Sequence, residues 1–202
     1  MLVDADATED RIRALWEQGD LRAATDLAIR AHGREIVSYL LALARNETEA
    51  GDAFSMFAED MWRGLPRFRW ESKLRTWMYV VARHALSQLR RDPYRNRGRC
   101  LDEAPEIYAA AEKVRTTTLA YLRSETKDRF ARLREALDPG DRELLILRVD
   151  RGLPWRDVAR VLAPSGDIDD EETLARDTAR LRKRFERIKA DLRARMREGE
   201  GE

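Results

Sequence analysis

The chain has 202 residues, a length that suits one large domain or two small ones. It contains 39 lysines and arginines against 38 aspartates and glutamates, and its one cysteine, Cys100, excludes an internal disulfide and a cysteine-based metal cage. The first residues lack the apolar core of a signal peptide, and no apolar run approaches the roughly 18 residues of a membrane span. We therefore expect a cytoplasmic protein that does not insert into membranes.

Charge is segregated along the chain although the total is nearly neutral. Residues 1–60 contain 13 acidic and 6 basic residues, residues 63–99 contain 2 acidic and 11 basic, and residues 176–197 contain 3 acidic and 10 basic. An acidic start followed by two basic segments suggests two contacts with anionic partners and one with a basic surface. Ordinary solvated helix faces are the alternative for each segment.

Helical periodicity predicts an all-α fold, because no alternating β-branched run of useful length occurs. In the first half we expect helices at about residues 8–18, 20–45, 52–63 and 74–91. Turn-forming residues and charge then predict a linker over about residues 92–115, with room for a short helix. Further helices are expected at about residues 119–137 and 141–149, from Pro154, and after the acidic run 167–172.

The segment 66–91 combines two different faces. Its apolar positions follow helical spacing and predict a buried stripe: Leu74, Trp77, Met78, Val81, Ala82, Ala85, Leu86 and Leu89. The opposite face is predicted to carry Arg75, Tyr79, Arg83, His84, Arg90 and Arg91. A basic loop with aromatic residues precedes it, and cations interleaved with aromatics suit a surface that holds unstacked bases along a phosphate backbone. A solvated helix face is the competing interpretation.

The C-terminal half has the order of a helix-turn-helix, with a short helix from Pro154, a turn, and a longer basic helix. The longer helix has a predicted buried stripe of Leu174, Thr178, Leu181, Phe185, Ile188 and Leu192. Its arginines lie off that stripe, and arginine binds phosphates and guanine edges. An αα-hairpin kept soluble by its arginines is the alternative.

No pattern indicates enzyme chemistry or a resident cofactor. His32 and His84 do not form a metal-binding pair, and no phosphate-binding glycine loop occurs. The run 167–172 lacks the turn glycine and the bidentate glutamate of a calcium loop, so we expect it to cap a helix instead. We predict a protein that is not an enzyme, with no catalytic residues, metal or cofactor.

Taken together, these segments resemble a sigma-70 family RNA polymerase sigma factor of the extracytoplasmic-function (ECF) type. The resemblance rests mainly on Trp62, the Leu-Pro-Arg-Phe run 65–68, the Leu-Arg-Thr-Trp run 74–77, Tyr79 and the Leu-Arg-Arg run 89–91. A second match starts at Leu137 and resembles region 4 of the family. The whole resemblance implies two helical domains, with region 2 at residues 1–91, the linker at 92–115, and a region 4 helix-turn-helix at 116–198.

The resemblance implies that the protein binds core RNA polymerase and directs initiation at promoters with −10 and −35 elements. Expected partners are the polymerase β′ coiled coil and β flap and promoter DNA, with an anti-sigma factor as a further candidate. Residues implied at the polymerase interface are Asp52, Phe54, Phe57, Glu59, Asp60 and Met61. Residues implied at the −10 element are Arg67, Arg69, Trp70, Lys73, Arg75, Thr76, Arg83, His84 and Ser87. Residues implied at the −35 element are Thr173, Arg176, Arg180, Arg184 and Arg187.

Two departures from the family pattern bear on these expectations. Ser55-Met56 stands where the family often has a Gln-Glu pair, so polar contacts with polymerase must differ. The turn before Thr173 is longer than usual and carries the acidic run 167–172, whose charge would oppose the approach of DNA. The alternative function is a helical regulator or polymerase-bound adaptor whose C-terminal half binds protein.

Overall fold

A computed structural model describes residues 5–92, 104–124, 137–163 and 170–198. These residues form helices and short connections with no β-strand, which confirms the all-α prediction. The chain divides into two compact units, Met1–Glu125 and Thr126–Glu202. None of the helices within the described stretches is both long enough and apolar enough to cross a membrane.

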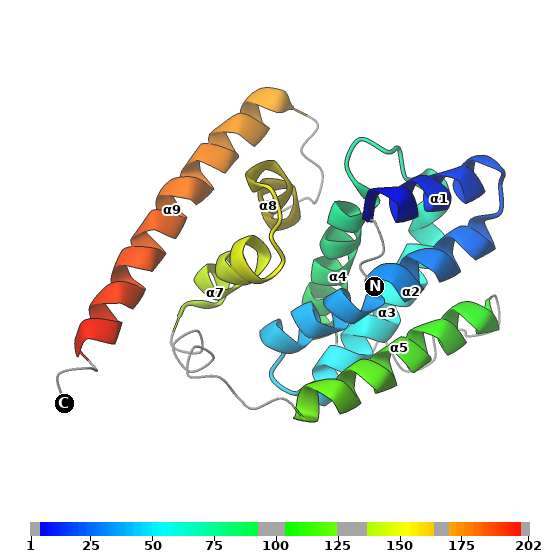
Figure 1. Ribbon diagram of the computed structural model, residues 1–202, viewed down its shortest axis with the longest axis horizontal. Coiled ribbons are helices and arrows are strands. Elements are labelled where there is room, and N and C mark those ends of the chain that lie inside the picture. The colour runs from blue at the N-terminus through cyan, green and yellow to red at the C-terminus, as the bar shows by residue number, and fades with distance from the viewer. Residues whose placement is uncertain (1–4, 93–103, 125–136, 164–169, 199–202) are drawn as a thin grey trace. The chain divides into compact units, whose positions relative to one another are not determined.

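The first unit is a bundle built around α2 and α3 (Figure 1). Its elements are α1 (Ala5–Glu17), α2 (Leu21–Leu43), α3 (Glu47–Gly64), the 3-10 turn η1 (Leu65–Arg67), α4 (Leu74–Arg91) and α5 (Pro105–Ser124). Helix α2 packs against α1, α3, α4 and α5, and α3 also packs against α4 and α5. These two helices are therefore covered on several sides.

Side-chain caps fix where α2 and α3 begin. The Asp20 carboxylate accepts from the Ala23 backbone N–H at 3.0 Å, and the Asn46 side chain accepts from the Glu49 N–H at 2.8 Å. Such caps satisfy backbone donors that have no partner within the helix. Because Asn46 caps α3, the helix begins at Glu47 rather than at the expected Asp52.

The large apolar side chains of α3 lie in the core. Phe54, Phe57 and Met61, expected to offer surface to polymerase, are at most 1% exposed. The two phenylalanine rings stack on each other with centroids 5.4 Å apart. The expectation is corrected for these three residues, because helices pack against α3 on more sides than the sequence pattern indicated.

The stripe predicted for α4 is buried, apart from Trp77, which is half-buried. The burial extends further round the helix than predicted, because α2 and α3 both pack against α4. Thr76 is 1% exposed and Tyr79 is fully buried, with its ring edge-on to Tyr39 at 5.1 Å. Thr76, expected to face DNA, and Tyr79, expected on the outer face, are corrected to core positions.

Part of the segment expected to be a linker belongs to the first unit. Residues 105–115 form the first part of α5, and Ile107, Ala110 and Ala111 are buried where α5 packs on α2 and α3. The remaining linker residues 93–103 lie outside the described residues, as do residues 125–136 of an expected helix.

The second unit contains a short helix that packs on a long one. Its elements are α7 (Pro139–Leu145), a π-helical turn η2 (Ile146–Asp150), α8 (Trp155–Leu162) and α9 (Glu171–Glu198). Helix α9 packs against α7 and α8. Its predicted stripe is buried from Leu174 to Ile188, and Leu192 is half-buried.

Candidate nucleic-acid interface

A loop at residues 68–73 joins η1 to α4 and displays the basic and aromatic residues predicted for base capture. Trp70 has a positive φ of 58°, a backbone conformation that is uncommon for a residue other than glycine. Its ring lies 5.0 Å from that of Phe68, and the Phe68 ring stacks on Trp77 at 4.9 Å. The indole Nε1 of Trp70 is buried without a hydrogen-bond partner. Backbone strain of this kind collects at functional sites, which makes Trp70 a candidate site residue.

Helix α1 contacts this loop from the other side. The ring of Trp16 lies edge-on to Trp70 at 6.0 Å, and the Arg13 guanidinium lies 5.4 Å from the centre of the Trp70 ring. The Trp16 indole N–H donates to the Leu65 carbonyl at 2.8 Å, and Lys73 pairs with Asp6 at 2.7 Å. Helix α1 therefore contacts η1 before the loop, the central tryptophan of the loop, and its last residue, Lys73.

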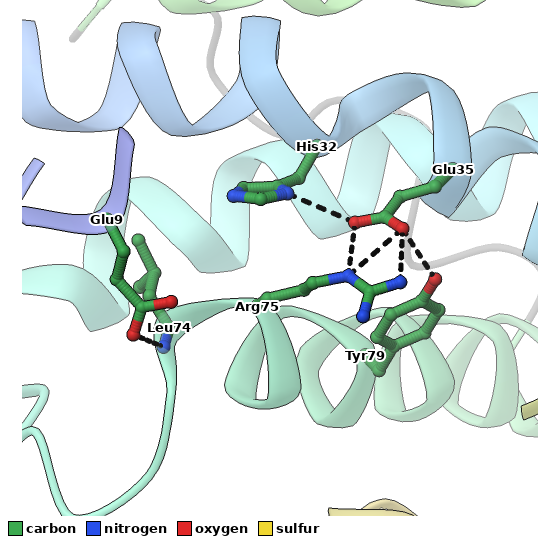
Figure 2. A network of polar contacts seen from close by, with 6 residues as sticks. All are labelled: Glu9, His32, Glu35, Leu74, Arg75 and Tyr79. Carbon is green, nitrogen blue, oxygen red and sulfur yellow. Dashed lines mark hydrogen bonds and ion pairs between the residues drawn. The ribbon is translucent and has the colours of Figure 1, made fainter. Parts of the chain in front are cut away.

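The first turn of α4 is capped by a residue of α1. Lys73 at the N-cap position offers no side-chain cap, and the Glu9 carboxylate accepts from the Leu74 N–H at 2.9 Å instead (Figure 2). A carboxylate at a helix N-terminus also complements the helix dipole. The sequence analysis did not find this role of Glu9, because the contact joins residues 65 positions apart.

An ion-paired network on α2 and α4 lies near the start of α4 (Figure 2). Arg75 donates two hydrogen bonds from separate nitrogens to the Glu35 carboxylate, at 2.9 and 2.7 Å. The Tyr79 hydroxyl donates to the same carboxylate at 3.2 Å, and His32 Nδ1 lies 3.0 Å from it. Arg75 was expected to face DNA, but its guanidinium is engaged by Glu35 and only 28% of its side chain is exposed.

This network changes the protonation of Glu35. Burial opposes ionisation, but hydrogen bonds from His32 and Arg75 and the positive charge of Arg75 outweigh it and lower the pKa of Glu35 to about 2. The same carboxylate raises the pKa of Arg75. Both groups are therefore charged at neutral pH, and the network ties α2 to α4.

The other residues expected at the −10 element differ in exposure. Arg67, Arg69, Lys73 and Ser87 are exposed, whereas Trp70, Arg83 and His84 are half-buried. Arg69 pairs with Glu71 at 3.3 Å, and both side chains remain about 60% exposed. The structure thus gathers the exposed cations at the loop and buries Thr76 beside it.

Helix α9 presents most of the residues expected at the −35 element. Arg176, Arg180 and Arg187 are exposed, and Thr173 is half-buried in the first turn. Arg184 differs, since it donates to Asp141 of α7 and joins two helices of the unit. The Asp170 carboxylate accepts from the Thr173 N–H at 2.8 Å and caps α9, while Glu171 and Glu172 lie in its first turn.

A comparison with protein families identifies the central part of the first unit. Residues 28–96 match the family model of sigma-70 region 2. The match covers about a third of the chain and supports a likeness of this part to members of the sigma-70 family. It spans most of α2, all of α3 and the candidate loop, and α4. No curated protein and no solved structure matches the chain significantly.

Three parts of the protein lie outside the residues matched to sigma-70 region 2. They are α1, which holds the candidate loop, α5, which covers α2 and α3, and the second unit. For the polymerase interface, Asp52 is exposed and Asp60 is half-buried, whereas Glu59 is buried and pairs with Arg63 at 2.7 Å. Among the described residues, no three His, Cys, Asp or Glu side chains are grouped as metal ligands would be.

Proposed function

We propose that this protein is a sigma factor of the ECF type, which binds core RNA polymerase and directs initiation at promoters with −10 and −35 elements. The match of residues 28–96 to sigma-70 region 2 carries the proposal. In this function the protein performs no bond chemistry and needs no cofactor. It supplies contacts that offset the cost of unpairing promoter bases, a few kcal/mol for an extruded base.

The loop 68–73 and the start of α4 would hold the melted −10 element. Exposed Arg67, Arg69 and Lys73 supply cations for the phosphate backbone, and the ring of Trp70 supplies a surface on which a base can stack. Arg75 would act chiefly by fixing α4 against α2 through Glu35. Arg83, His84 and Ser87 lie further along α4 and would follow the same strand.

The second unit would bind the −35 element through α9. Arg176, Arg180 and Arg187 are exposed on this helix, while the buried stripe from Leu174 to Ile188 anchors it within the unit. Arginines arranged in this way suit the major groove and its phosphates. Arg184 would instead hold α9 against α7 through its hydrogen bond to Asp141.

One observation favours a second candidate function for this unit. Asp170, Glu171 and Glu172 are exposed at the N-terminus of α9, where a recognition helix would approach phosphates. Three acids there oppose DNA binding. The alternative is therefore a polymerase-bound adaptor or regulator whose second unit binds protein.

Transcription in vitro with core polymerase and a library of promoter fragments tests the proposal. A sigma factor will start transcripts at fixed positions on a restricted set of fragments that share −10 and −35 sequences. The adaptor alternative predicts polymerase binding without initiation of its own. Folded protein and active core that yield no promoter-specific transcript would refute the sigma-factor assignment.

A further inference from the structure

We infer that the face of α2 and α3 beneath α5 is the surface on which core polymerase docks, and that α5 occupies it in the free protein. This inference rests on the proposed function, and it adds a regulated step: α5 must leave its site before the sigma factor joins polymerase. Figure 1 shows α5 alongside α2 and α3, and both helices contact it.

Two glycines let α5 approach α2 and α3 closely. A Cβ atom built at Gly33 of α2 would lie 2.9 Å from Val114 Cγ1, and one built at Gly51 of α3 would lie 2.7 Å from the Arg115 guanidinium. At Gly33 the distance is too short for a Cβ atom unless Val114 moves, whereas at Gly51 the near atom is the end of a flexible arginine side chain that can shift. Gly33 is therefore the position that allows the close approach of α5 to its seat on α2 and α3, and Gly51 adds room for the Arg115 side chain.

The seat includes residues that the family resemblance places at polymerase. The Cβ atom built at Gly33, which lies close to Val114, also lies 3.4 Å from Cζ of the Phe54 ring. Gly51, beneath Arg115, immediately precedes the exposed Asp52. Helix α5 thus lies over the first half of α3, which holds Asp52 and Phe54, two of the six residues that the family resemblance implies at the polymerase interface.

The side chains that α5 places on this face are mostly small. Ile107, Ala110, Ala111 and Thr118 are buried, and Val114 and Arg115 are half-buried. The side chains of the ion pair between Glu106 and Arg22 of α2 are 39% and 59% exposed, although the pairing oxygen Glu106 Oε1 is buried. An interface of small apolar contacts and a partly exposed ion pair is one that another helix can replace.

The chemistry of the seat specifies a helical partner. It already accepts a helix with small residues on one face and an acid that reaches Arg22. One helix of a polymerase coiled coil with an acidic residue at that position would make the same contacts. Since one seat cannot hold two helices, polymerase and α5 must exclude each other.

A reversible disulfide between α2 and α5 tests this directly. The built Cβ at Gly33 lies 3.6 Å from Val114 Cβ, within the range found in disulfides. We would introduce Gly33→Cys and Val114→Cys into a Cys100→Ser background, and measure core polymerase binding with and without dithiothreitol. The oxidised protein should bind at least tenfold more weakly than the reduced protein, and the Cys100→Ser parent should not respond to the reductant.

The outcomes separate this inference from the proposed function. Equal polymerase affinity of the fully oxidised and reduced proteins would overturn the inference, because α5 would then remain seated in the complex. A Cys100→Ser parent that is folded but fails to bind core polymerase would instead overturn the proposed function.

A charge reversal supplies a test that does not require cysteines in the seat. Glu106→Arg should weaken the seating of α5 by repulsion from Arg22 and increase polymerase affinity a few-fold. In an Arg22→Glu background the same Glu106→Arg change restores an opposite-charge pair. It should therefore strengthen the seating of α5 and lower polymerase affinity relative to Arg22→Glu alone. If Glu106→Arg changes hydrogen exchange across α5 but leaves polymerase affinity unaltered, the inference is wrong.

Discussion

Glu35 connects two helices of the first unit through a single carboxylate. Its pKa of about 2 lies below the ordinary value of 4.5, so protonation is disfavoured in the folded state. The resulting stabilisation is complete above the ordinary pKa and is lost as the pH falls from about 4.5 towards 2. The difference between these two pKa values corresponds to at most about 3–4 kcal/mol.

The pH dependence of unfolding therefore provides the first prediction. Urea unfolding of the first unit should show a larger free energy at pH 6 than at pH 3, and Glu35→Gln should remove much of that difference. Trp155→Phe would serve as background, so that fluorescence reports only tryptophans outside the second unit. Glu17→Gln, in an exposed pair with Arg13, is the matched control and should change the pH profile little.

Trp70 is the residue whose conformation most favours a direct role in melting. Stacking of a base on an aromatic side chain contributes about 1–3 kcal/mol, so Trp70→Ala should reduce promoter opening roughly 5- to 100-fold. Binding to core polymerase should fall much less. Permanganate footprinting of melted thymines and a polymerase binding assay measure the two quantities.

A conservative variant separates stacking from packing for Trp70. Trp70→Phe retains an aromatic face and should recover most of the promoter opening lost in Trp70→Ala. Equal losses of opening and polymerase binding in Trp70→Ala would show that Trp70 only packs against Phe68 and Trp16.

At the scale of elements, α1 organises the loop and the first turn of α4. Loss of a helix cap typically costs about 1 kcal/mol, so Glu9→Ala should destabilise the first unit by about that amount. The loop would also lose the fixed point at Leu74 that follows its end, and promoter opening should decline with polymerase binding retained. Asp10→Ala is the control, because Asp10 is exposed on the same helix. An identical effect of both variants would exclude a specific role for Glu9.

The sequence predicted the helices best where their apolar faces are regular. The stripes of α4 and α9 could be read from steps of three and four, because each packs one main face against its unit. Prediction failed where an element is covered from several sides. Phe54 and Phe57 could be taken for surface aromatics because nothing in their spacing reveals that α5 packs on α3 as well.

The contacts that shape the candidate site could not be found by local reasoning. Glu9 meets Leu74, and Glu35 meets Arg75, across 65 and 40 positions of sequence. Their acidic side chains resembled ordinary solvated charge. The basic loop itself was recognisable because its residue types are adjacent in the chain, whereas its supports come from α1 and α2.

At the scale of the whole molecule, the segregated charge has an internal explanation in the first unit. Among the described residues, four ion pairs join the acidic residues 1–60 to the basic residues 63–99: Asp6 with Lys73, Glu35 with Arg75, Glu49 with Arg90, and Glu59 with Arg63. Part of the acidic start therefore neutralises the basic segment within the bundle. At the loop, Arg69 and Lys73 are exposed but paired with Glu71 and Asp6, so an outside anion would have to replace these acids, which costs little for exposed pairs.

In the second unit several basic residues of α9 are paired with acids, and these pairs differ in exposure. Arg180 lies 3.4 Å from Asp177 with 73% of its side chain exposed, whereas Arg184 is held by Asp141 of α7. Exposed pairs of this kind contribute little to stability. Arg180 can therefore exchange Asp177 for a phosphate at low cost, and Arg184 cannot do so without releasing α7.

This contrast gives a prediction that separates DNA binding from structure. In the full chain, Arg180→Ala should weaken binding to promoter duplex and reduce the slope of log affinity against log salt by about one, with the melting temperature nearly unchanged. Arg184→Ala should lower the melting temperature because it detaches α9 from α7. An unaltered salt slope in Arg180→Ala would show that Arg180 does not contact phosphate. If Arg176→Ala and Arg187→Ala also leave the slope unaltered, the results favour the adaptor function for this unit.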